Sequence, residues 1–134
     1  MDAKELQERT KRFTVRAVRF CRRLPGTWEA RRIGGQLIDA TTSVYANYRA
    51  TCRGRSRAEF IAKIGVVAEE ADESLAWLEL IDALELSRGA ELAWLLDEAD
   101  QLVAIFAASQ KTAKKNRPQS TITNRQSTIT EAPP

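Results

Sequence analysis

Four stretches of this chain repeat apolar residues every three or four positions, and short segments that disfavour helix separate them. This spacing is typical of amphipathic helices. Pro25-Gly26 separates the first two stretches, because proline disfavours helical geometry in the residue before it. The expected helices run from about Ala3 to Arg23, from Thr27 to about Cys52, from Ser56 to about Leu86, and from about Gly89 to Thr112.

Four helices joined by short loops predict an all-α fold, an up-down-up-down antiparallel four-helix bundle. We expect the bundle to occupy residues 1–113. Residues 114–134 are rich in Ser, Thr, Gln and Pro, and the segment Gln119–Thr123 recurs as Gln126–Thr130. Such a composition buries too little apolar area to offset the entropy cost of ordering. The sequence therefore predicts a disordered C-terminal tail over residues 114–134.

The charged residues are sorted along the chain. Residues 1–57 contain 14 Lys or Arg and 5 Asp or Glu, whereas residues 58–116 contain 5 and 12. The first two expected helices are therefore basic and the last two acidic, although the formal net charge is only +3. This asymmetry indicates either a polyanionic partner for the basic half or contact between the two halves, within one subunit or between subunits.

Signatures of catalysis and metal binding are scarce. The chain has no histidine, which is the commonest general base and metal ligand. Ser43, Ser74 and the two cysteines therefore lack the usual base partner. The carboxylates of residues 69–73 lack the Glu-x-x-His units of metal-binding bundles. We expect a non-enzymatic protein with no metal and no cofactor.

The compartment is inferred from what the sequence lacks. No apolar run reaches the roughly 20 residues that span a bilayer, and the N-terminus has no apolar region typical of a secretory signal. We expect a cytoplasmic protein without membrane contact. Cys21 and Cys52 end the first and second expected helices, so antiparallel packing places them roughly 35–40 Å apart. A disulfide between them is not expected.

Three polar residues, Gln36, Ser43 and Asn47, accompany the apolar stripe of the second expected helix at spacings of seven and four. These spacings place them on one face. If that face points inward, each needs a hydrogen-bond partner, and Glu73 and Ser74 on the third helix are the candidates. The pattern predicts a buried polar network of Gln36, Ser43, Asn47 and Glu73, with contact to a ligand as the alternative.

Arginines gather at both turns that bound the second expected helix. The groups are Arg22, Arg23, Arg31 and Arg32 at the first turn, and Arg49, Arg53, Arg55 and Arg57 at the second. Arginine near a helix C-terminus is favourable by itself, by roughly 0.3–1 kcal/mol, which accounts for only some of them. Arginine in place of lysine favours bidentate contacts with phosphate or carboxylate. The candidate nucleic-acid-binding residues are Arg31, Arg32, Arg49, Arg53, Arg55 and Arg57.

Trp77, Trp94 and Tyr45 are large side chains for a small bundle. Most aromatic residues at helical spacing belong to the core, but the two tryptophans lie beside the main apolar stripes. Since Trp and Tyr are enriched at binding hot spots, these residues are candidates for an interface.

The central segment resembles a known family. The residues that carry the resemblance are Gln36-Leu37, Ser43-Val44, Asn47, Ser56-x-x-Glu59-Phe60, Glu73 and Leu78-Glu79. The order and spacing of these residues resemble the pattern of a family of four-helix bundle proteins, related to those encoded in intervening sequences of 23S ribosomal RNA genes. The resemblance covers about residues 10–108. The chain departs from the common pattern at Ala50 and Thr51, where a glutamate and a glycine are usual.

The resemblance implies a bundle that assembles with itself as a homopentameric ring. It also implies a distant relation to the accessory variability protein of diversity-generating retroelements, which works with a reverse transcriptase and RNA. Two functional hypotheses therefore stay open. One is an oligomeric accessory protein that associates with nucleic acid, RNA in the first place, and the other is a protein-only oligomeric scaffold that binds no nucleic acid.

Overall fold

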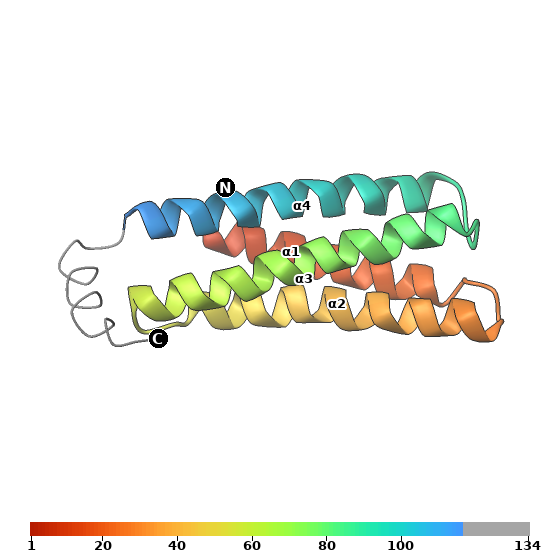
Figure 1. The fold of residues 1–134 in the computed structure, drawn as a ribbon, viewed down its shortest axis with the longest axis horizontal. Helices are drawn as coiled ribbons and strands as arrows, with labels where there is room; N and C mark the ends of the chain where they lie inside the picture. Colours follow the sequence, from red (N-terminus) through yellow and green to blue (C-terminus); the bar gives the residue numbers. More distant parts are fainter. Residues whose placement is uncertain (117–134) are drawn as a thin grey trace, which may run out of the picture.

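The computed structural model of the protein describes residues 1–116. Over these residues the chain forms four α-helices: α1 (Ala3–Cys21), α2 (Trp28–Cys52), α3 (Arg57–Ala83) and α4 (Ala90–Lys115). Each helix runs antiparallel to the one before it, so the predicted up-down-up-down bundle is confirmed (Figure 1). The predicted tail begins inside α4, at residues 114 and 115, and from residue 117 onward it lies outside the described residues.

Side-chain caps fix where the first three helices begin. Asp2 accepts a hydrogen bond from the Glu5 backbone N–H while Glu5 accepts one from the Asp2 N–H, which is a reciprocal capping box. Thr27 and Ser56 cap α2 and α3 by accepting from the N–H three residues later. These caps satisfy backbone donors that have no partner inside a helix.

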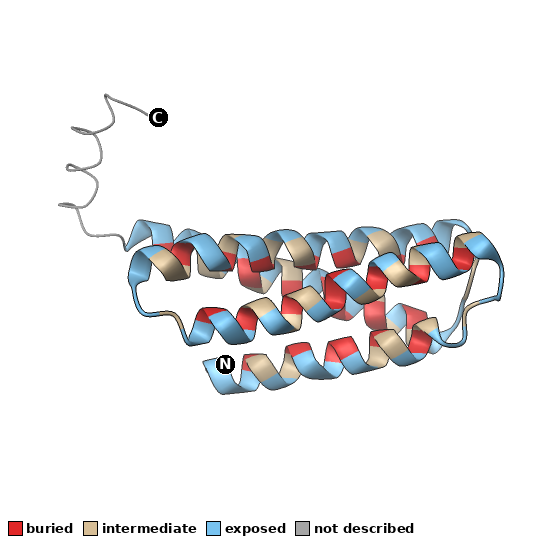
Figure 2. Ribbon diagram, turned by 90° about the horizontal axis from the view of Figure 1, so that it is seen from below, coloured by how far each residue is buried: buried red, intermediate tan, exposed pale blue. Residues whose placement is uncertain are grey.

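The core runs the length of the bundle between the four helices, where the buried residues line the inner faces (Figure 2). The rings of Tyr48 and Phe106 pack with their centroids 5.2 Å apart, which joins α2 to α4 near one end. Fully buried side chains include Phe13 of α1, Leu37 and Val44 of α2, Ile64 and Leu78 of α3, and Leu102 and Phe106 of α4.

The helices do not pack equally. α3 makes extensive contact with α2 and with α4, α1 packs on α2 over a smaller surface, and the contact between α1 and α4 is the slightest of the four. Within residues 1–116, no helix combines the length and apolar character needed to span a membrane.

Two arginine–glutamate pairs bridge the slight contact between α1 and α4. Arg9 donates from Nε and Nη2 to the two carboxylate oxygens of Glu98, at 2.7 and 2.9 Å. Arg16 makes the same two-pronged contact with Glu91, at 3.0 and 2.6 Å, and its guanidinium carbon lies 3.5 Å from the centre of the Trp94 ring. Part of the opposite charge of the two halves is therefore paired inside one subunit.

Candidate nucleic-acid interface

Four of the predicted arginines lie around the turn between α2 and α3. Arg49 is in the last turn of α2, Arg53 is its C-terminal cap, Arg55 is in the connecting turn, and Arg57 is the first residue of α3. All four are exposed. The turn brings them to one end of the bundle.

The end of α4 lies at the same end of the bundle (Figure 1). A hollow of about 430 Å³ is lined by Arg57 and Phe60 of α3 and by Thr112 and Ala113 of α4, which places the two segments side by side. Lys114 and Lys115 occupy the last turn of α4. We call this surface the basic end, and it comprises Arg49, Arg53, Arg55, Arg57, Lys114 and Lys115.

The sequence carries no local signal that groups Lys114 and Lys115 with these arginines. They are more than 50 positions from Arg57 along the chain and follow an acidic segment, so only the antiparallel return of α4 reveals the proximity. The signal that could have identified them is topological. In an up-down-up-down bundle the second turn and the C-terminus of the fourth helix share one end.

The cations of the basic end have no carboxylate within ion-pair distance among the described residues. The nearby carboxylate of Glu59 already accepts from the Arg55 backbone N–H at 3.2 Å and lies 4.0 Å from the Lys63 ammonium. This differs from α1, where Arg9 and Arg16 are held in two-pronged pairs. Within residues 1–116, the positive charge of the basic end is therefore exposed and has no carboxylate partner.

Arg31 and Arg32 are exposed in the first turns of α2. α2 has 25 residues, so at 1.5 Å per residue they lie roughly 30 Å from the basic end along the bundle. The structure therefore divides the six predicted arginines between two ends of the bundle. Only Arg49, Arg53, Arg55 and Arg57 come together.

A hollow of about 400 Å³ lies beside Arg32, between the start of α2 and α3, and is lined by Trp28, Glu29, Arg32, Ile33, Gln36 and Trp77. Trp28 is 73% exposed, the most of any large apolar residue in the described part of the chain. Trp28 is not one of the aromatic residues, Trp77, Trp94 and Tyr45, that the sequence marks as interface candidates. As the first residue of α2, it falls before the apolar repeat can be recognised.

The two tryptophans selected from the sequence have partners within the subunit. The Arg16 guanidinium covers Trp94, and the Trp77 indole N–H donates to Glu73 at 3.3 Å. Both side chains are partly buried. Trp94 therefore belongs to the contact between α1 and α4, whereas Trp77 lines the hollow beside Trp28.

The predicted burial of the polar network is wrong. Gln36 and Glu73 are exposed, and Ser43 and Asn47 are only partly buried. Each of the four directly precedes a buried residue, namely Leu37, Val44, Tyr48 and Ser74. One position along an α-helix is a rotation of about 100°, so the residues that were assigned to the inner face lie on its flank.

The polar side chains that are buried are mostly hydroxyls. The Thr14 hydroxyl lies 2.9 Å from the carbonyl oxygens of both Thr10 and Thr41, which links α1 to α2, and Ser74 donates to the Glu70 carbonyl at 2.9 Å. A hydroxyl can bond to the preceding turn of its own helix, so it enters a core without a dedicated partner. Threonine at a position of the apolar stripe is the sequence signal for this arrangement.

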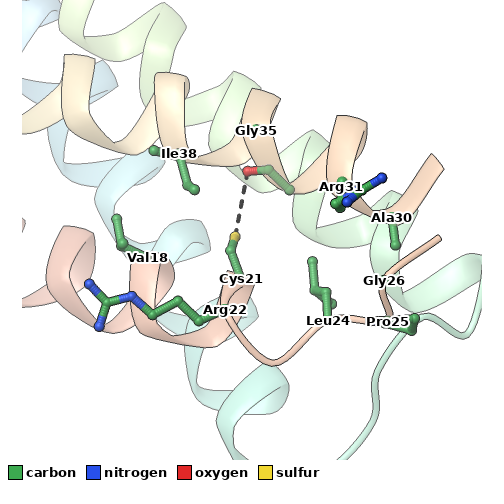
Figure 3. A pocket seen from close by; sticks show the side chains of 11 residues that line it. Val18, Cys21, Arg22, Leu24, Pro25, Gly26, Ala30, Arg31, Gly35 and Ile38 are labelled. Atoms are coloured by element: carbon green, nitrogen blue, oxygen red, sulfur yellow. Dashed lines mark hydrogen bonds between the residues drawn. The ribbon is translucent and has the colours of Figure 1, made fainter. Parts of the chain in front are cut away.

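A further hollow, of about 540 Å³, lies between the end of α1 and the start of α2, with Arg22 and Arg31 among its lining residues (Figure 3). The Cys21 thiol lies 3.5 Å from the Gly34 carbonyl oxygen, and burial raises the pKa of Cys21 to about 11. Both cysteines are free. Across residues 1–116, no three acidic or cysteine side chains are grouped as a metal site requires.

Comparison with known proteins identifies the relatives of the chain. The sequence model described as 23S rRNA-intervening sequence protein matches residues 4–108. A crystal structure of a protein of unknown function, from the S23 ribosomal protein family of Bacteroides thetaiotaomicron VPI-5482, is similar with a TM-score of 0.74. That alignment covers 83% of this chain and 99% of the other at 24% identity, so it shows the fold alone. No curated protein matches the chain.

Proposed function

The chain belongs to the 23S rRNA-intervening sequence protein family, and on this basis we propose that it is a non-enzymatic accessory protein that binds RNA through the basic end. The observation that carries the proposal is the convergence there of exposed cations from α2, α3 and α4. Phosphate contacts supply most of the affinity of proteins for nucleic acids. The residues in contact are proposed to be Arg49, Arg53, Arg55 and Arg57, with Lys114 and Lys115.

The pairing of charges inside the subunit supports this assignment. Arg9 and Arg16 of the basic half form ion pairs with Glu98 and Glu91, so an external anion would have to displace a carboxylate to bind them. The arginines of the basic end keep their guanidinium donors available for two-pronged contacts with phosphate. Arg9 and Arg16 are therefore less available to an external anion than the cations of the basic end, although Lys11, Arg12 and Arg19 stay exposed on α1.

The test is a binding titration of a short single-stranded RNA at several salt concentrations. The logarithm of the binding constant should fall linearly with the logarithm of salt concentration, with a slope of about −0.7 for each phosphate neutralised. Arg55→Gln together with Arg57→Gln should weaken binding and reduce the slope by about 1.4. Arg12→Gln together with Arg19→Gln removes the same charge from exposed positions on α1 and should have a much smaller effect.

The competing hypothesis is an oligomeric scaffold whose basic and acidic surfaces meet across subunits. It gives a different result in the same experiment, provided that native mass is measured alongside. Absence of RNA binding at low salt, together with an oligomer that dissociates as salt rises, would overturn the proposal in favour of the scaffold. Equal loss of affinity in the two double variants would refute the assignment to the basic end.

A further inference from the structure

The hollow beside Trp28 has a composition that the basic end does not share. One indole, Trp28, is largely exposed, and a second, Trp77, is partly buried in the same lining. The Trp77 N–H donates to Glu73, which fixes the orientation of that ring. Two indoles and Ile33 give the hollow an apolar interior. Among residues 1–116, no side chain covers the exposed face of Trp28.

The polar residues of the hollow are nearly balanced in charge. Arg32 is opposed by Glu29, and Gln36 contributes a neutral amide that both donates and accepts hydrogen bonds. An apolar, aromatic hollow with no strong net charge and one amide suits a flat, neutral group with hydrogen-bonding edges. A nucleobase has this chemistry, and its π-face stacks on aromatic side chains.

The surface next to the hollow carries the charge that a nucleotide also requires. Arg31 and Arg32 are exposed, and neither lies within ion-pair distance of a carboxylate among residues 1–116. Phosphates on either side of a base held against Trp28 would therefore meet guanidinium groups. This arrangement gives Arg31 and Arg32, which lie far from the basic end, a role of their own.

We propose that the hollow formed by Trp28, Arg32, Gln36 and Trp77 receives one unpaired base of RNA, stacked on Trp28, while Arg31 and Arg32 contact its phosphates. This inference rests on the proposed function and specifies its substrate. The base must be free of a duplex, because bases inside an A-form helix cannot be stacked on a side chain. The protein therefore binds RNA with single-stranded segments in preference to uninterrupted duplex.

The experiment compares the wild-type protein with Trp28→Ala, Trp28→Phe and Leu84→Ala on a single-stranded RNA and on a duplex of equal length. Trp28→Ala should lose about 5- to 150-fold in affinity for the single strand, the range for stacking of one base, and little for the duplex. Trp28→Phe should retain most of the affinity. Leu84 is also an exposed apolar residue, 50% exposed, in the α3–α4 turn, and its replacement should change nothing.

Fluorescence provides an independent readout, since stacking on a base should quench the indole emission of the wild-type protein more than that of Trp28→Phe. Because Trp28 is exposed, its replacement should leave the unfolding transition unchanged. If the wild type binds both RNAs and Trp28→Ala binds the single strand equally well, the inference fails and the proposed function stands. If the wild type binds neither RNA, both fail. A change in native mass without a change in RNA affinity would identify Trp28 as a subunit contact and overturn the inference.

Discussion

Arg9 and Glu98 lie 89 positions apart in the chain, yet two nitrogens of the guanidinium reach both carboxylate oxygens, at 2.7 and 2.9 Å. A second pair, Arg16 with Glu91, repeats this contact one heptad along each helix in the antiparallel register. The side chains of Arg9 and Glu98 are only 20% and 9% exposed. The slight contact between α1 and α4 thus includes one largely desolvated ion pair and a second pair whose side chains are each 34% exposed.

Replacement of Arg9 should lower the stability of the bundle more than replacement of an ordinary surface residue. Arg9→Met leaves Glu98 buried without its two charged donors, and we expect the free energy of unfolding to fall by about 2–3 kcal/mol. Glu98→Met in the same chain should recover part of that loss, because no buried charge then remains unpaired. Denaturant unfolding of the two single variants and the double variant measures the coupling. Additive effects would show that the pair contributes no interaction energy.

Stability should depend on pH through Glu91. The Arg16 hydrogen bonds lower the pKa of Glu91 in the folded protein below its ordinary value of 4.5. The carboxylate therefore contributes stability that is fully present above pH 4.5 and is lost as the pH falls through the folded pKa. Glu91→Gln should flatten this acid-side decline in the denaturation midpoint. Glu8→Gln, at an exposed position of α1, serves as the control and should leave the decline as it is.

The adjacent glycines of α2 should respond differently to alanine. A Cβ at Gly35 would meet nothing within 4 Å, so Gly35→Ala should raise the free energy of unfolding by about 1 kcal/mol through helix propensity. A Cβ at Gly34 would lie 3.2 Å from Cδ1 of Leu24 and close to Cys21. That crowding should cancel the gain in Gly34→Ala. Thermal or denaturant unfolding distinguishes them, and an equal gain in both variants would contradict the packing at Gly34.

The two thiols should differ in reactivity. Cys52 is exposed, whereas Cys21 is half-buried and burial raises its pKa to about 11. Because the thiolate is the reactive form, a thiol reagent at mildly alkaline pH should modify Cys52 rapidly and Cys21 slowly. Cys52→Ser should abolish the fast phase and leave the slow one. Two fast phases in the native protein would show that Cys21 is accessible.

The number, order and direction of the helices follow from apolar periodicity and from the breakers between them. α1 begins at Ala3 and α2 ends at Cys52, as the sequence predicts, whereas α3 ends at Ala83, before the expected Leu86. Helix ends depend on local capping and on the packing of the following turn, which periodicity does not encode.

Which face of each helix points into the core is harder to predict from the sequence than the length of the helix. The helical spacing of Gln36, Ser43 and Asn47 predicts one shared face, with Glu73 as the expected partner, but spacing leaves the phase of that face open by one position. Trp28 is not predictable in this way, because it is the first residue of α2 and stands before the apolar repeat begins. The last turns of α4, which contain Lys114, come beside Arg57 only through the tertiary arrangement, in which Thr112 and Ala113 line a hollow with Arg57. Clusters of residues near one turn can thus be predicted from the sequence. A surface assembled from distant segments can be identified only once the arrangement of the helices is known.

The slight contact between α1 and α4 has a consequence for the order in which the bundle opens. Helix α3 makes extensive contacts with both α2 and α4, while α1 is joined to the rest by its face on α2 and by two charged pairs to α4. Native proteins open locally in cooperative units of unequal free energy. We therefore expect α1 to be the first element to detach in sub-global fluctuations, and its amide protons to exchange with solvent ahead of those in α3. High ionic strength should widen that difference, since it screens the more exposed pair, Arg16 with Glu91.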